Sequence, residues 1–382
     1  MTKIAAFYPN YFHIAGIAYA ALSVIEAMQV NDVEMSLMGI ASGLDLSKPF
    51  YHNALPIWSK SLAYRLLTYN QINNLAEFRF SHSLKKSDIA YLWPAVSIEL
   101  YQNLRERGHK LIMENVNTHQ ATSKSILDAE YARLGLKVCH GITLEDVSEE
   151  SEKVKLADFV FSCSPAVTAS LLAVNAPPEK LLETTYGLRE SDILTPNVMA
   201  ERSRGNEITA IFVGTIGVRK GPHLILDYWC KSKVKGKLML VGDIQAEVRH
   251  IIEPYLKRPD IEHVPYVKDL RSIYKEADVF VLPSLEEGSP LVTYLALGAG
   301  LPCIVSPMGG GGIVEHGKNG LVINPHDEQS WIDALKNISE DVNLRESFSK
   351  NAYGKAADYL WSTVGRKRIQ LLLSRLNGQK VN

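Results

Sequence analysis

Short apolar segments alternate with longer amphipathic ones through the first half of the chain. Apolar residues recur at helical spacing from about Gly16 to Met28 and again near Ile98 to Arg107. The short apolar segments are predicted strands, and they cover Lys3–Tyr8, Val33–Met38, Ile89–Leu92, Lys110–Met113 and Phe159–Ser164. Strands that alternate with helices predict a parallel sheet covered by helices on both faces.

The second half repeats this pattern more regularly. A helix is predicted near Glu328 to Ile338, and further helices between the apolar segments. The segments are almost continuously apolar, as strands covered on both faces of a sheet must be. They cover Ile208–Gly214, Lys237–Gly242, Val279–Leu282, Pro302–Val305 and Gly320–Ile323.

A polar stretch separates the two series. Arg189–Glu207 combines proline, asparagine and mixed charges, which is typical of a linker. A chain of 382 residues is also longer than one ordinary core, since a domain takes roughly 150 residues. We therefore predict an α/β protein of two doubly wound parallel-sheet domains, 1–190 and 208–360, joined by a linker at 191–207. Ligands of such sheets bind at the carboxyl ends of the strands, so a cleft between the domains is the expected site.

Composition and charge exclude several classes of protein. The 41 Lys and Arg residues against 42 Asp and Glu residues leave a net charge of −1, which gives no overall attraction to nucleic acid. No apolar run reaches the roughly 18 residues that a membrane-spanning helix needs. The first 20 residues lack the apolar stretch of a signal peptide, so we expect a mature N-terminus.

The four cysteines do not pair in sequence. Cys139, Cys163, Cys230 and Cys303 form no CxxC motif, so the sequence predicts neither a zinc site nor a disulfide framework. We expect a cytoplasmic, reducing environment.

The first segment with candidate chemistry is FVGTIGVRKG, Phe212 to Gly221. Glycines at a strand end, followed by Arg219 and Lys220 at a helix start, suit an anionic ligand such as a diphosphate. The alternative is that both cations are solvated surface charges. The segment contains neither GxxxxGK[ST] nor GxGxxG, which argues against a P-loop NTPase and a simple dinucleotide dehydrogenase.

The second segment, Val279 to Gly300, leads a buried strand through two glutamates into a helix. Ser289 is a plausible N-cap, with Pro290 at the first helical position. The free amides near Leu291 and Val292 would then face the cleft, and Glu287 beside them could hold sugar hydroxyls. Otherwise Glu287 only balances the helix dipole.

The third segment, Ser306 to Gly320, contains four consecutive glycines. Such a run permits close approach of the backbone to a ligand, or it is a flexible surface turn.

Together these segments resemble the donor domain of GT-B-fold glycosyltransferases, similar to the large family 4 of retaining enzymes (group 1). The order and spacing match from about Ile208 to Leu335. The N-terminal half is similar more weakly, in NTHQ, ADFVFSCSPAV and PPEKLLETTYGL. The tail, YLWSTVGRKRIQLLL, is similar to the final helix of the family, which crosses back onto the first domain. The resemblance implies an acceptor domain at 1–190, a donor domain at 208–360 and a crossing helix at 361–382.

The resemblance also implies roles for individual residues. Lys220, with Arg219, would hold the donor diphosphate beside Gly214 and Thr215. Glu287 matches the first Glu of the E-x7-E motif, which touches the transferred sugar. The remaining implied contacts are an N-terminal glycine loop, a cleft histidine and backbone amides that bind the sugar and distal phosphate: Gly16, His119, Gly288, Ser289, Pro290, Leu291 and Val292. For His119 a structural role is equally open.

Two positions depart from the family pattern. Leu295 stands where the family has the second Glu of E-x7-E, which usually binds the nucleotide ribose. Thr215 stands where an Arg often follows the strand-end glycine, and Arg219 is a candidate to compensate. These departures leave the donor identity open.

The resemblance implies a retaining, metal-independent transferase with no cofactor. Its co-substrate would be a UDP-, GDP- or other nucleotide diphosphate sugar. Its acceptor would be a glycan or lipid-linked hydroxyl in bacterial polysaccharide, glycolipid or lipopolysaccharide synthesis. Two alternatives are a non-catalytic GT-B subunit that binds sugar nucleotides or glycans, and a GT-B sugar-nucleotide epimerase.

The segment 58–86 is the one strongly basic part of the first domain. It carries Lys60, Arg65, Arg79, Lys85 and Lys86 against Glu77 alone, with apolar residues at helical spacing. A basic amphipathic helix could rest on an anionic membrane, at the inner face of the cytoplasmic membrane. The alternative is a helix packed on the domain with a solvated basic face.

Overall fold

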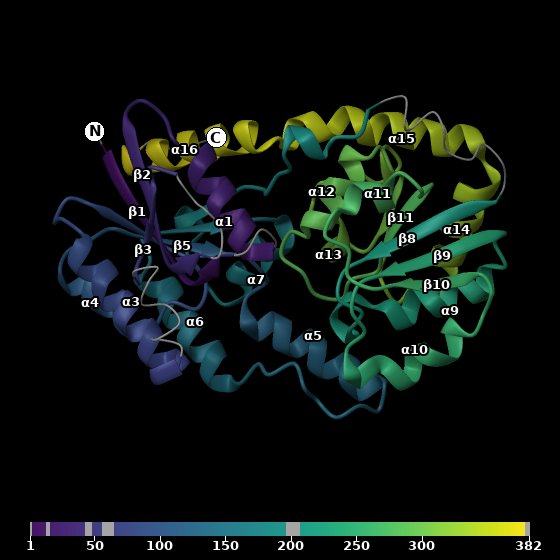
Figure 1. Ribbon diagram of the computed structural model, residues 1–382, viewed down its shortest axis with the longest axis horizontal. Helices are drawn as coiled ribbons and strands as arrows, with labels where there is room; N and C mark the ends of the chain where they lie inside the picture. The colour runs from purple at the N-terminus through teal and green to yellow at the C-terminus, as the bar shows by residue number, and fades with distance from the viewer. Residues whose placement is uncertain (1, 13–15, 43–47, 56–64, 196–206, 379–382) are drawn as a thin grey trace.

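The computed structural model describes residues 2–12, 16–42, 48–55, 65–195 and 207–378. Two parallel sheets lie side by side, each covered by helices on both faces (Figure 1). We call the part around the first sheet the N-terminal domain and the part around the second sheet the C-terminal domain. The predicted linker, 191–207, is described only at 191–195 and at Glu207.

The N-terminal sheet has seven strands in the order β3-β2-β1-β4-β5-β6-β7. Neighbouring strands pair in parallel throughout. The strand order reverses between β1 and β4, which makes this the ligand-binding point of a doubly wound sheet. The strands are β1 (Thr2–Phe12), β2 (Val33–Ser42), β3 (Tyr51–Asn53), β4 (Ile89–Leu92), β5 (Leu111–Asn115), β6 (Phe159–Ser162) and β7 (Leu181–Glu183).

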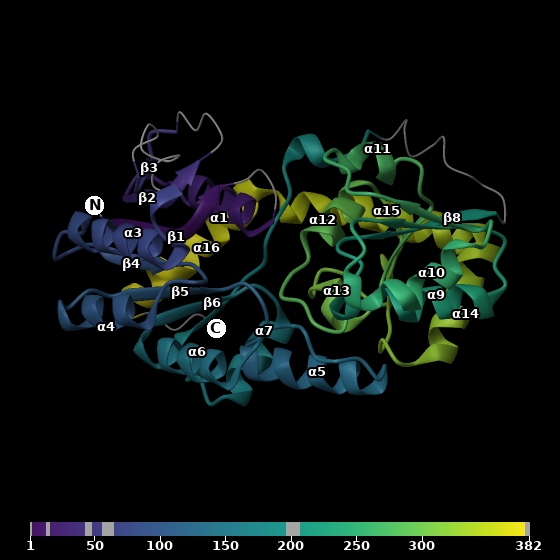
Figure 2. The ribbon, with the colours of Figure 1, turned by 60° about the horizontal axis from the view of Figure 1, so that its bottom comes forward.

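Helices cover both faces of this sheet. One of them, α5, runs from the N-terminal domain towards the C-terminal domain and packs against it (Figure 2). The helices are α1 (Gly16–Ala27), α3 (Tyr69–Ser83), α4 (Ile98–Glu106), α5 (Gln120–Arg133), α6 (Leu144–Leu156) and α7 (Pro165–Ala173), with short 3-10 turns η2 (Pro178–Lys180) and η3 (Glu190–Asp192).

The C-terminal sheet has six strands in the order β10-β9-β8-β11-β12-β13, again all parallel. Its order reverses between β8 and β11, so the two domains present equivalent strand ends to each other. The strands are β8 (Ile208–Val213), β9 (Gly236–Val241), β10 (Ile261–Val264), β11 (Val279–Leu282), β12 (Cys303–Val305) and β13 (Gly320–Val322).

The helices of the C-terminal domain fill the connections between these strands. They are η4 (Val218–Lys220), α9 (Pro222–Ser232), η5 (Ala246–Val248), α10 (Arg249–Leu256), α11 (Leu270–Tyr274), α12 (Leu291–Gly298), α13 (Pro307–Gly310), α14 (Glu328–Glu340), α15 (Val342–Ala356) and η6 (Ala357–Tyr359).

The last helix, α16 (Trp361–Leu376), returns to the N-terminal domain, and α15 and α16 run along one side of both domains (Figure 1). A Cβ atom at Gly365 would lie 2.3 Å from the Ala27 carbonyl oxygen, so α16 packs directly on the backbone at the end of α1. Arg368, on the buried face of α16, is fully buried and pairs with Glu114 at the end of β5. The tail therefore forms part of the N-terminal core.

The strands differ from the sequence prediction at two kinds of place. β1 was predicted to end at Tyr8, but it continues past Pro9 to Phe12. Proline has no N–H to donate, and it is tolerated here because β4 pairs with β1 only as far as Phe7, so no hydrogen bond to β4 is lost. The register of β1 against β2 shifts between Tyr8 and Tyr11, around the proline. The strands β3, β7 and β10 were not predicted. They are short edge strands that show little alternation.

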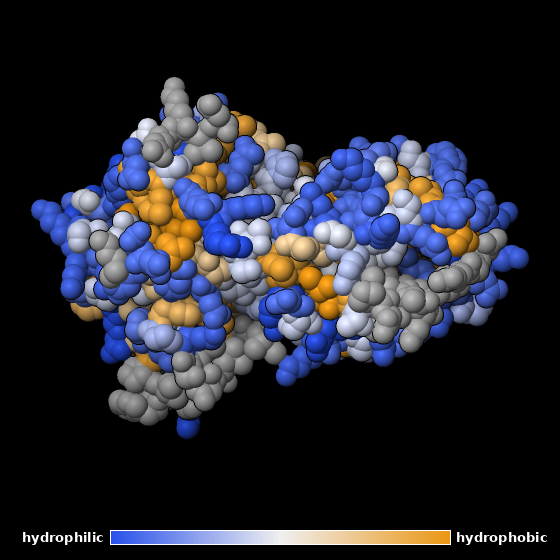
Figure 3. Space-filling model, turned by 90° about the horizontal axis from the view of Figure 1, so that it is seen from above, coloured by the Kyte–Doolittle hydropathy of each residue, from blue (hydrophilic) through white to orange (hydrophobic). Residues whose placement is uncertain are grey.

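Apolar residues are distributed unevenly over the surface. Seen from above, they gather in patches on both domains and at the waist between them, on a surface that is otherwise mainly hydrophilic (Figure 3). In the described part of the chain, no helix is long and apolar enough to cross a membrane.

Candidate functional site

A cavity of about 460 Å³ lies between the two domains at the carboxyl ends of β1, β8 and β11. The N-terminal domain contributes Gly16 and Tyr19, and the C-terminal domain contributes Gly214, Lys220 and Val292 among others. We call it the Lys220 cavity. It lies where the strand order of the C-terminal sheet reverses, as expected of a ligand site in a doubly wound fold.

Lys220 enters this cavity from the turn after β8. Gly214 has a φ of +140°, and a Cβ atom there would lie 2.7 Å from the Lys220 side chain. Gly221, which follows Lys220, is left-handed with a φ of +66°. Both glycines are therefore needed for the chain to fold Lys220 back over the strand end.

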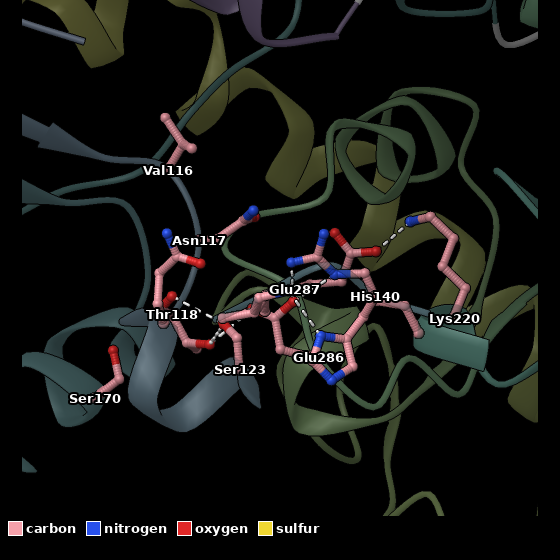
Figure 4. Close-up of polar contacts among 12 residues, drawn as sticks. Val116, Asn117, Thr118, Ser123, His140, Ser170, Lys220, Glu286 and Glu287 are labelled. Atoms are coloured by element: carbon pink, nitrogen blue, oxygen red, sulfur yellow. Dashed lines mark hydrogen bonds and ion pairs between the residues drawn. The ribbon is translucent and has the colours of Figure 1, made fainter. Parts of the chain in front are cut away.

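Glu287 is the partner of Lys220. The Lys220 Nζ donates a hydrogen bond to Glu287 Oε1, and both side chains are largely buried (Figure 4). An anionic ligand would compete with this carboxylate for the lysine, and the carboxylate would then be free to accept hydrogen bonds from hydroxyls. The two residues predicted from separate segments thus lie together.

The amino end of α12 lines the same cavity through Ser289, Pro290, Leu291 and Val292. Here the prediction of a serine cap was wrong. Pro290 is the N-cap and makes no side-chain cap, because the Ser289 hydroxyl instead bonds the Tyr294 hydroxyl at 2.7 Å. With no side-chain cap on them, the first amides of α12 are available to an anion.

A second helix begins at the opposite wall. Gly16 starts α1 with a φ of +63°, and a Cβ atom there would meet nothing within 4 Å. Conformation rather than space therefore favours glycine at this position. The amino ends of α1 and α12 both line the cavity, so two positive helix ends and the Lys220 ammonium converge on it.

Gly288 brings the two domains into contact. A Cβ atom on Gly288 would lie 1.7 Å from the Val116 carbonyl oxygen in the loop after β5. This close approach explains the glycine, and it places the backbone of the predicted donor loop against the N-terminal domain. Val116 and Asn117 line the Lys220 cavity and also a second cavity beyond this contact.

Arg219 does not join Lys220 in the cavity. It forms an ion pair with Glu286, whose side chain is fully buried, and it faces the second cavity. Glu286 also accepts hydrogen bonds across the domain boundary from Thr118 at 2.7 Å and Ser123 at 3.1 Å (Figure 4). The sequence interpretation overlooked Glu286, although the adjacent glutamates at 286 and 287 were its signal.

His119 is fully buried and caps α5. Its Nδ1 accepts a hydrogen bond from the Ala121 amide at 3.1 Å, and burial lowers its pKa to about 4, so it is neutral near pH 7. Among the described residues, Thr118 and Gln120 line the second cavity, whereas the histidine between them lines neither cavity. The structure thus favours the structural role over a place beside the sugar.

The remaining predicted positions fall in two groups. Thr215 and Leu295 line the Lys220 cavity, so the two departures from the family pattern face the ligand space. The glycine run makes its close approaches to the protein itself. A Cβ atom at Gly309 would lie 2.2 Å from the Leu282 carbonyl oxygen, and one at Gly312 would lie 2.5 Å from Pro165.

Further charged residues line the Lys220 cavity as internal ion pairs that sequence alone did not reveal. Arg189 pairs with Asp192 at 2.8 Å, and Arg271 pairs with Asp269 at 3.0 Å. Among the described residues, no group of three or more His, Cys, Asp or Glu side chains is placed to hold a metal ion.

Comparison with known proteins agrees with this geometry. Residues 197–355 match the family model described as glycosyl transferases group 1. The matched segment covers most of the C-terminal domain. The D-inositol 3-phosphate glycosyltransferase of Corynebacterium diphtheriae is 25% identical over 241 residues, 57% of this chain and 56% of that protein. An Escherichia coli UDP-Gal:alpha-D-GlcNAc-diphosphoundecaprenol alpha-1,3-galactosyltransferase is 43% identical over 88 residues, 23% of this chain and 22% of that protein.

These matches are partial in length. The first curated relatives align over 22% to 60% of their own length. Solved structures match across the whole chain, at lower identity. Sucrose-phosphate synthase from Thermosynechococcus elongatus has a TM-score of 0.75 at 17% identity, covering 99% of this chain and 100% of that one. HepE of Anabaena, in complex with UDP and glucose, has a TM-score of 0.70 at 14% identity, covering 98% and 100%. The chain has the GT-B fold.

Proposed function

We propose that this chain is a retaining glycosyltransferase that moves a sugar from a nucleoside diphosphate sugar to an acceptor hydroxyl without a metal ion. The supporting observation is the convergence of Lys220, Glu287 and the amino ends of α1 and α12 on one cavity built from both domains. Such a site suits a diphosphate attached to a sugar. HepE, which shares the fold, was solved with UDP and UDP-glucose, so a uridine nucleotide is the first donor to test.

The residues around the cavity account for the proposed chemistry. The bond between the anomeric carbon and the diphosphate breaks, and the leaving diphosphate carries away the electron pair. Lys220 and the two helix ends stabilise the negative charge that develops on the leaving diphosphate. Such electrostatic stabilisation is usually the largest single contribution to an enzyme's rate enhancement. The acceptor oxygen then attacks the sugar on the same face, and its proton passes to a phosphate oxygen. We assign no protein base.

Donor binding would rearrange the Lys220–Glu287 pair. Lys220 donates a hydrogen bond to Glu287 in the structure. When a donor diphosphate replaces Glu287 as the partner of Lys220, the carboxylate becomes free to accept hydrogen bonds from the sugar hydroxyls of the donor. This exchange links donor recognition to placement of the sugar. It explains why both residues should be needed, although they neutralise each other in the unliganded protein.

We propose that the acceptor belongs to bacterial cell-surface glycan synthesis, as a lipid-linked or polysaccharide hydroxyl. The Escherichia coli relative is named for a diphosphoundecaprenol acceptor, and WaaG, a structure with a TM-score of 0.65 at 14% identity, is described as acting in lipopolysaccharide biosynthesis. An enzyme of this kind would work at the cytoplasmic face of the membrane.

Part of the predicted membrane segment supports this placement. Lys60 and its neighbours at 56–64 lie outside the described residues. In the described part, Leu66, Tyr69 and Phe78 are exposed by 71%, 52% and 59%. Glu77, the single acidic residue there, turns inward and accepts hydrogen bonds from Ser97. The exposed charges left on this face are Arg65, Arg79, Lys85 and Lys86.

A liposome assay tests the membrane contact. The purified chain should sediment with vesicles that contain anionic lipid at low salt, and Lys85/Lys86→Glu should weaken this binding because two attractions become repulsions. A matched control places the same charge change on exposed Lys257 and Lys350 of the C-terminal domain. Equal sedimentation of all three proteins would refute the contact.

The transferase is tested by nucleotide release with a panel of UDP- and GDP-sugars and glycan acceptors. Lys220→Ala and Glu287→Ala should each lower turnover by about a hundredfold or more, the usual cost of removing one transition-state contact. Lys275→Ala, an exposed lysine outside the cavity, should match the wild type. The anomeric signal of the product in a proton NMR spectrum reports retention, and a chelator reports any metal requirement.

Leu295 gives weight to a non-catalytic binding subunit as the second candidate, since the ribose contact of the family is absent there. Tight donor binding without turnover, against every acceptor, would favour that candidate. Conversion of the donor to another sugar nucleotide would instead indicate an epimerase. Leu295→Glu should tighten UDP or GDP binding if the missing carboxylate only relaxed recognition of the ribose.

A further inference from the structure

A second cavity, of about 630 Å³, lies on the other side of the contact between Gly288 and Val116. It opens at the carboxyl ends of β4 and β5 and is lined by Trp93, Tyr101 and Tyr131 of the N-terminal domain. We call it the Trp93 cavity. Because Val116 and Asn117 line both cavities, a group held here lies next to the Lys220 cavity.

The charges around the Trp93 cavity are mainly negative. Its lining includes five acidic side chains and two basic ones, Lys153 and Arg219. Both cations are already paired, Lys153 with Glu149 at 2.5 Å and Arg219 with Glu286. The acidic residues are Glu114, Asp146, Glu149, Glu150 and Glu247. Glu114 is paired with the buried Arg368 and Glu149 with Lys153, so Asp146, Glu150 and Glu247 make up the negative excess.

Several lining groups are suited to uncharged hydroxyls. Carboxylates accept hydrogen bonds and cannot donate them, so hydroxyl donors are their natural partners. Trp93 is only 1% exposed, and its indole N–H is buried without a hydrogen-bond acceptor among the described residues. This donor can bond an oxygen of a bound molecule or of water. Asn117, Gln120 and Gln245 add uncharged polar lining.

A phosphate would meet the opposite conditions. It would enter an excess of carboxylates, with neither lining cation free to receive it, and like charges at short range disfavour binding. Glu150 is 14% exposed, and burial, with a smaller repulsion from Glu286 across the domain boundary, already disfavours its charged form and raises its pKa to about 7. An additional anion would increase this cost.

We propose that the Trp93 cavity binds the terminal sugar of the acceptor as an uncharged unit and discriminates against acceptors that carry a phosphate on a hydroxyl of that sugar. This inference rests on the proposed transferase function, and it names the acceptor class for the same cleft. It separates this chain from those relatives that are named for D-inositol 3-phosphate.

Saturation-transfer NMR on the full chain tests the inference without requiring turnover. The probes are the methyl glycosides of glucose, galactose and N-acetylglucosamine, each compared with the 6-phosphate of the same sugar, with excess UDP present. We expect at least one uncharged glycoside to bind about tenfold more tightly than its phosphorylated counterpart, a difference that one poorly screened charge pair can produce.

A charge reversal assigns the discrimination to this cavity. Glu247→Arg places a cation on the rim and should reduce the ratio about tenfold, whereas Glu253→Arg makes the same change on exposed α10 and should preserve it. Equal or tighter binding of the phosphorylated sugars, no binding of either kind, or an unchanged ratio in Glu247→Arg would overturn the inference.

The proposed function can fail separately. If glycosides bind with the expected ratio while no nucleotide sugar is turned over, the transferase proposal fails and the assignment of the cavity stands. If transfer occurs only to phosphorylated acceptors, the transferase stands and the assignment fails.

Discussion

Burial determines the charge of two ionisable side chains near the contact between the domains. His119 and Glu150 both lie near the interdomain contact, and burial opposes the charged form of each. Burial lowers the pKa of His119 to about 4, while burial and the nearby Glu286 carboxylate raise the pKa of Glu150 to about 7. Near pH 7 the histidine is therefore neutral and the glutamate only partly ionised.

The cap role of His119 predicts the effect of replacing it. Asn is a good N-cap, so His119→Asn should keep turnover within a few-fold of wild type and cost about 1 kcal/mol of stability from the lost packing. Steady-state kinetics and thermal unfolding measure both. A hundredfold loss of kcat at unchanged stability would return His119 to the reacting centre.

The raised pKa of Glu150 predicts a pH-dependent gain from neutralising it. Because the folded-state pKa lies above the unfolded value of 4.5, the wild type loses stability as the pH rises from about 4.5 through about 7. Glu150→Gln keeps an acceptor for the Gln120 amide and avoids that loss. Thermal unfolding should show the variant more stable by about 1–2 kcal/mol near pH 8 and unchanged near pH 4.5. The exposed Glu253→Gln should show no such dependence, and a pH-independent effect of Glu150→Gln would contradict the argument.

At the scale of elements, the sequence predicted the central strands well and the loops less well. Buried strands such as β8, β9 and β11 are continuous apolar runs, so their pattern identifies them. The start of α12 was misassigned, because a Ser-Pro pair fits two capping arrangements and the Ser289 hydroxyl found a tertiary partner in Tyr294. The residue pattern and the family resemblance together predicted Lys220 and Glu287 as site residues, and both line the Lys220 cavity. Neither could show that the neighbouring Arg219 and Glu286 face a different cavity, since this depends on how the domains meet.

The return of α16 to the N-terminal domain depends on a buried ion pair. Arg368 and Glu114 are both fully buried, and Tyr91 and Tyr186 donate hydrogen bonds to the carboxylate. Glu114→Leu leaves the guanidinium without its partner and should cost roughly 3–5 kcal/mol in urea unfolding. The double variant Glu114→Leu/Arg368→Met removes both charges and should recover most of the loss. Equal destabilisation of the single and double variants would show that packing, not the pair, supports α16.

At the scale of the whole molecule, the two domains meet through a polar cluster at the far end of α5. Glu130 of α5 accepts a hydrogen bond from His223 of α9 at 2.7 Å and lies 3.3 Å from His326. Burial opposes ionisation of Glu130, but hydrogen bonds from His223 and Arg133 outweigh it and lower its pKa to about 2. Because the pKa of Glu130 is lowered in the folded protein, its hydrogen bonds to His223 and Arg133 contribute stability above about pH 4.5, and this contribution is lost as the pH falls towards 2.

This cluster should hold the domains in their closed arrangement. Glu130→Ala removes the shared acceptor and should cost roughly 1.5–3 kcal/mol of the contact between domains, shifting the population towards open forms. Small-angle X-ray scattering should show a larger radius of gyration than in the wild type. Glu145→Ala, an exposed residue on α6, serves as the control. Identical scattering curves for Glu130→Ala and wild type would exclude a role in closure.

The central claim is that the Lys220 cavity binds a nucleoside diphosphate, and calorimetric titration of the full chain with UDP and GDP tests it most directly. We predict saturable binding of at least one of them at one site per chain. Lys220→Ala should weaken this binding by about tenfold or more, as for the loss of a charge-assisted contact, and Lys275→Ala should leave it unchanged. Saturable binding that Lys220→Ala does not alter, or no binding of either nucleotide, would contradict the account.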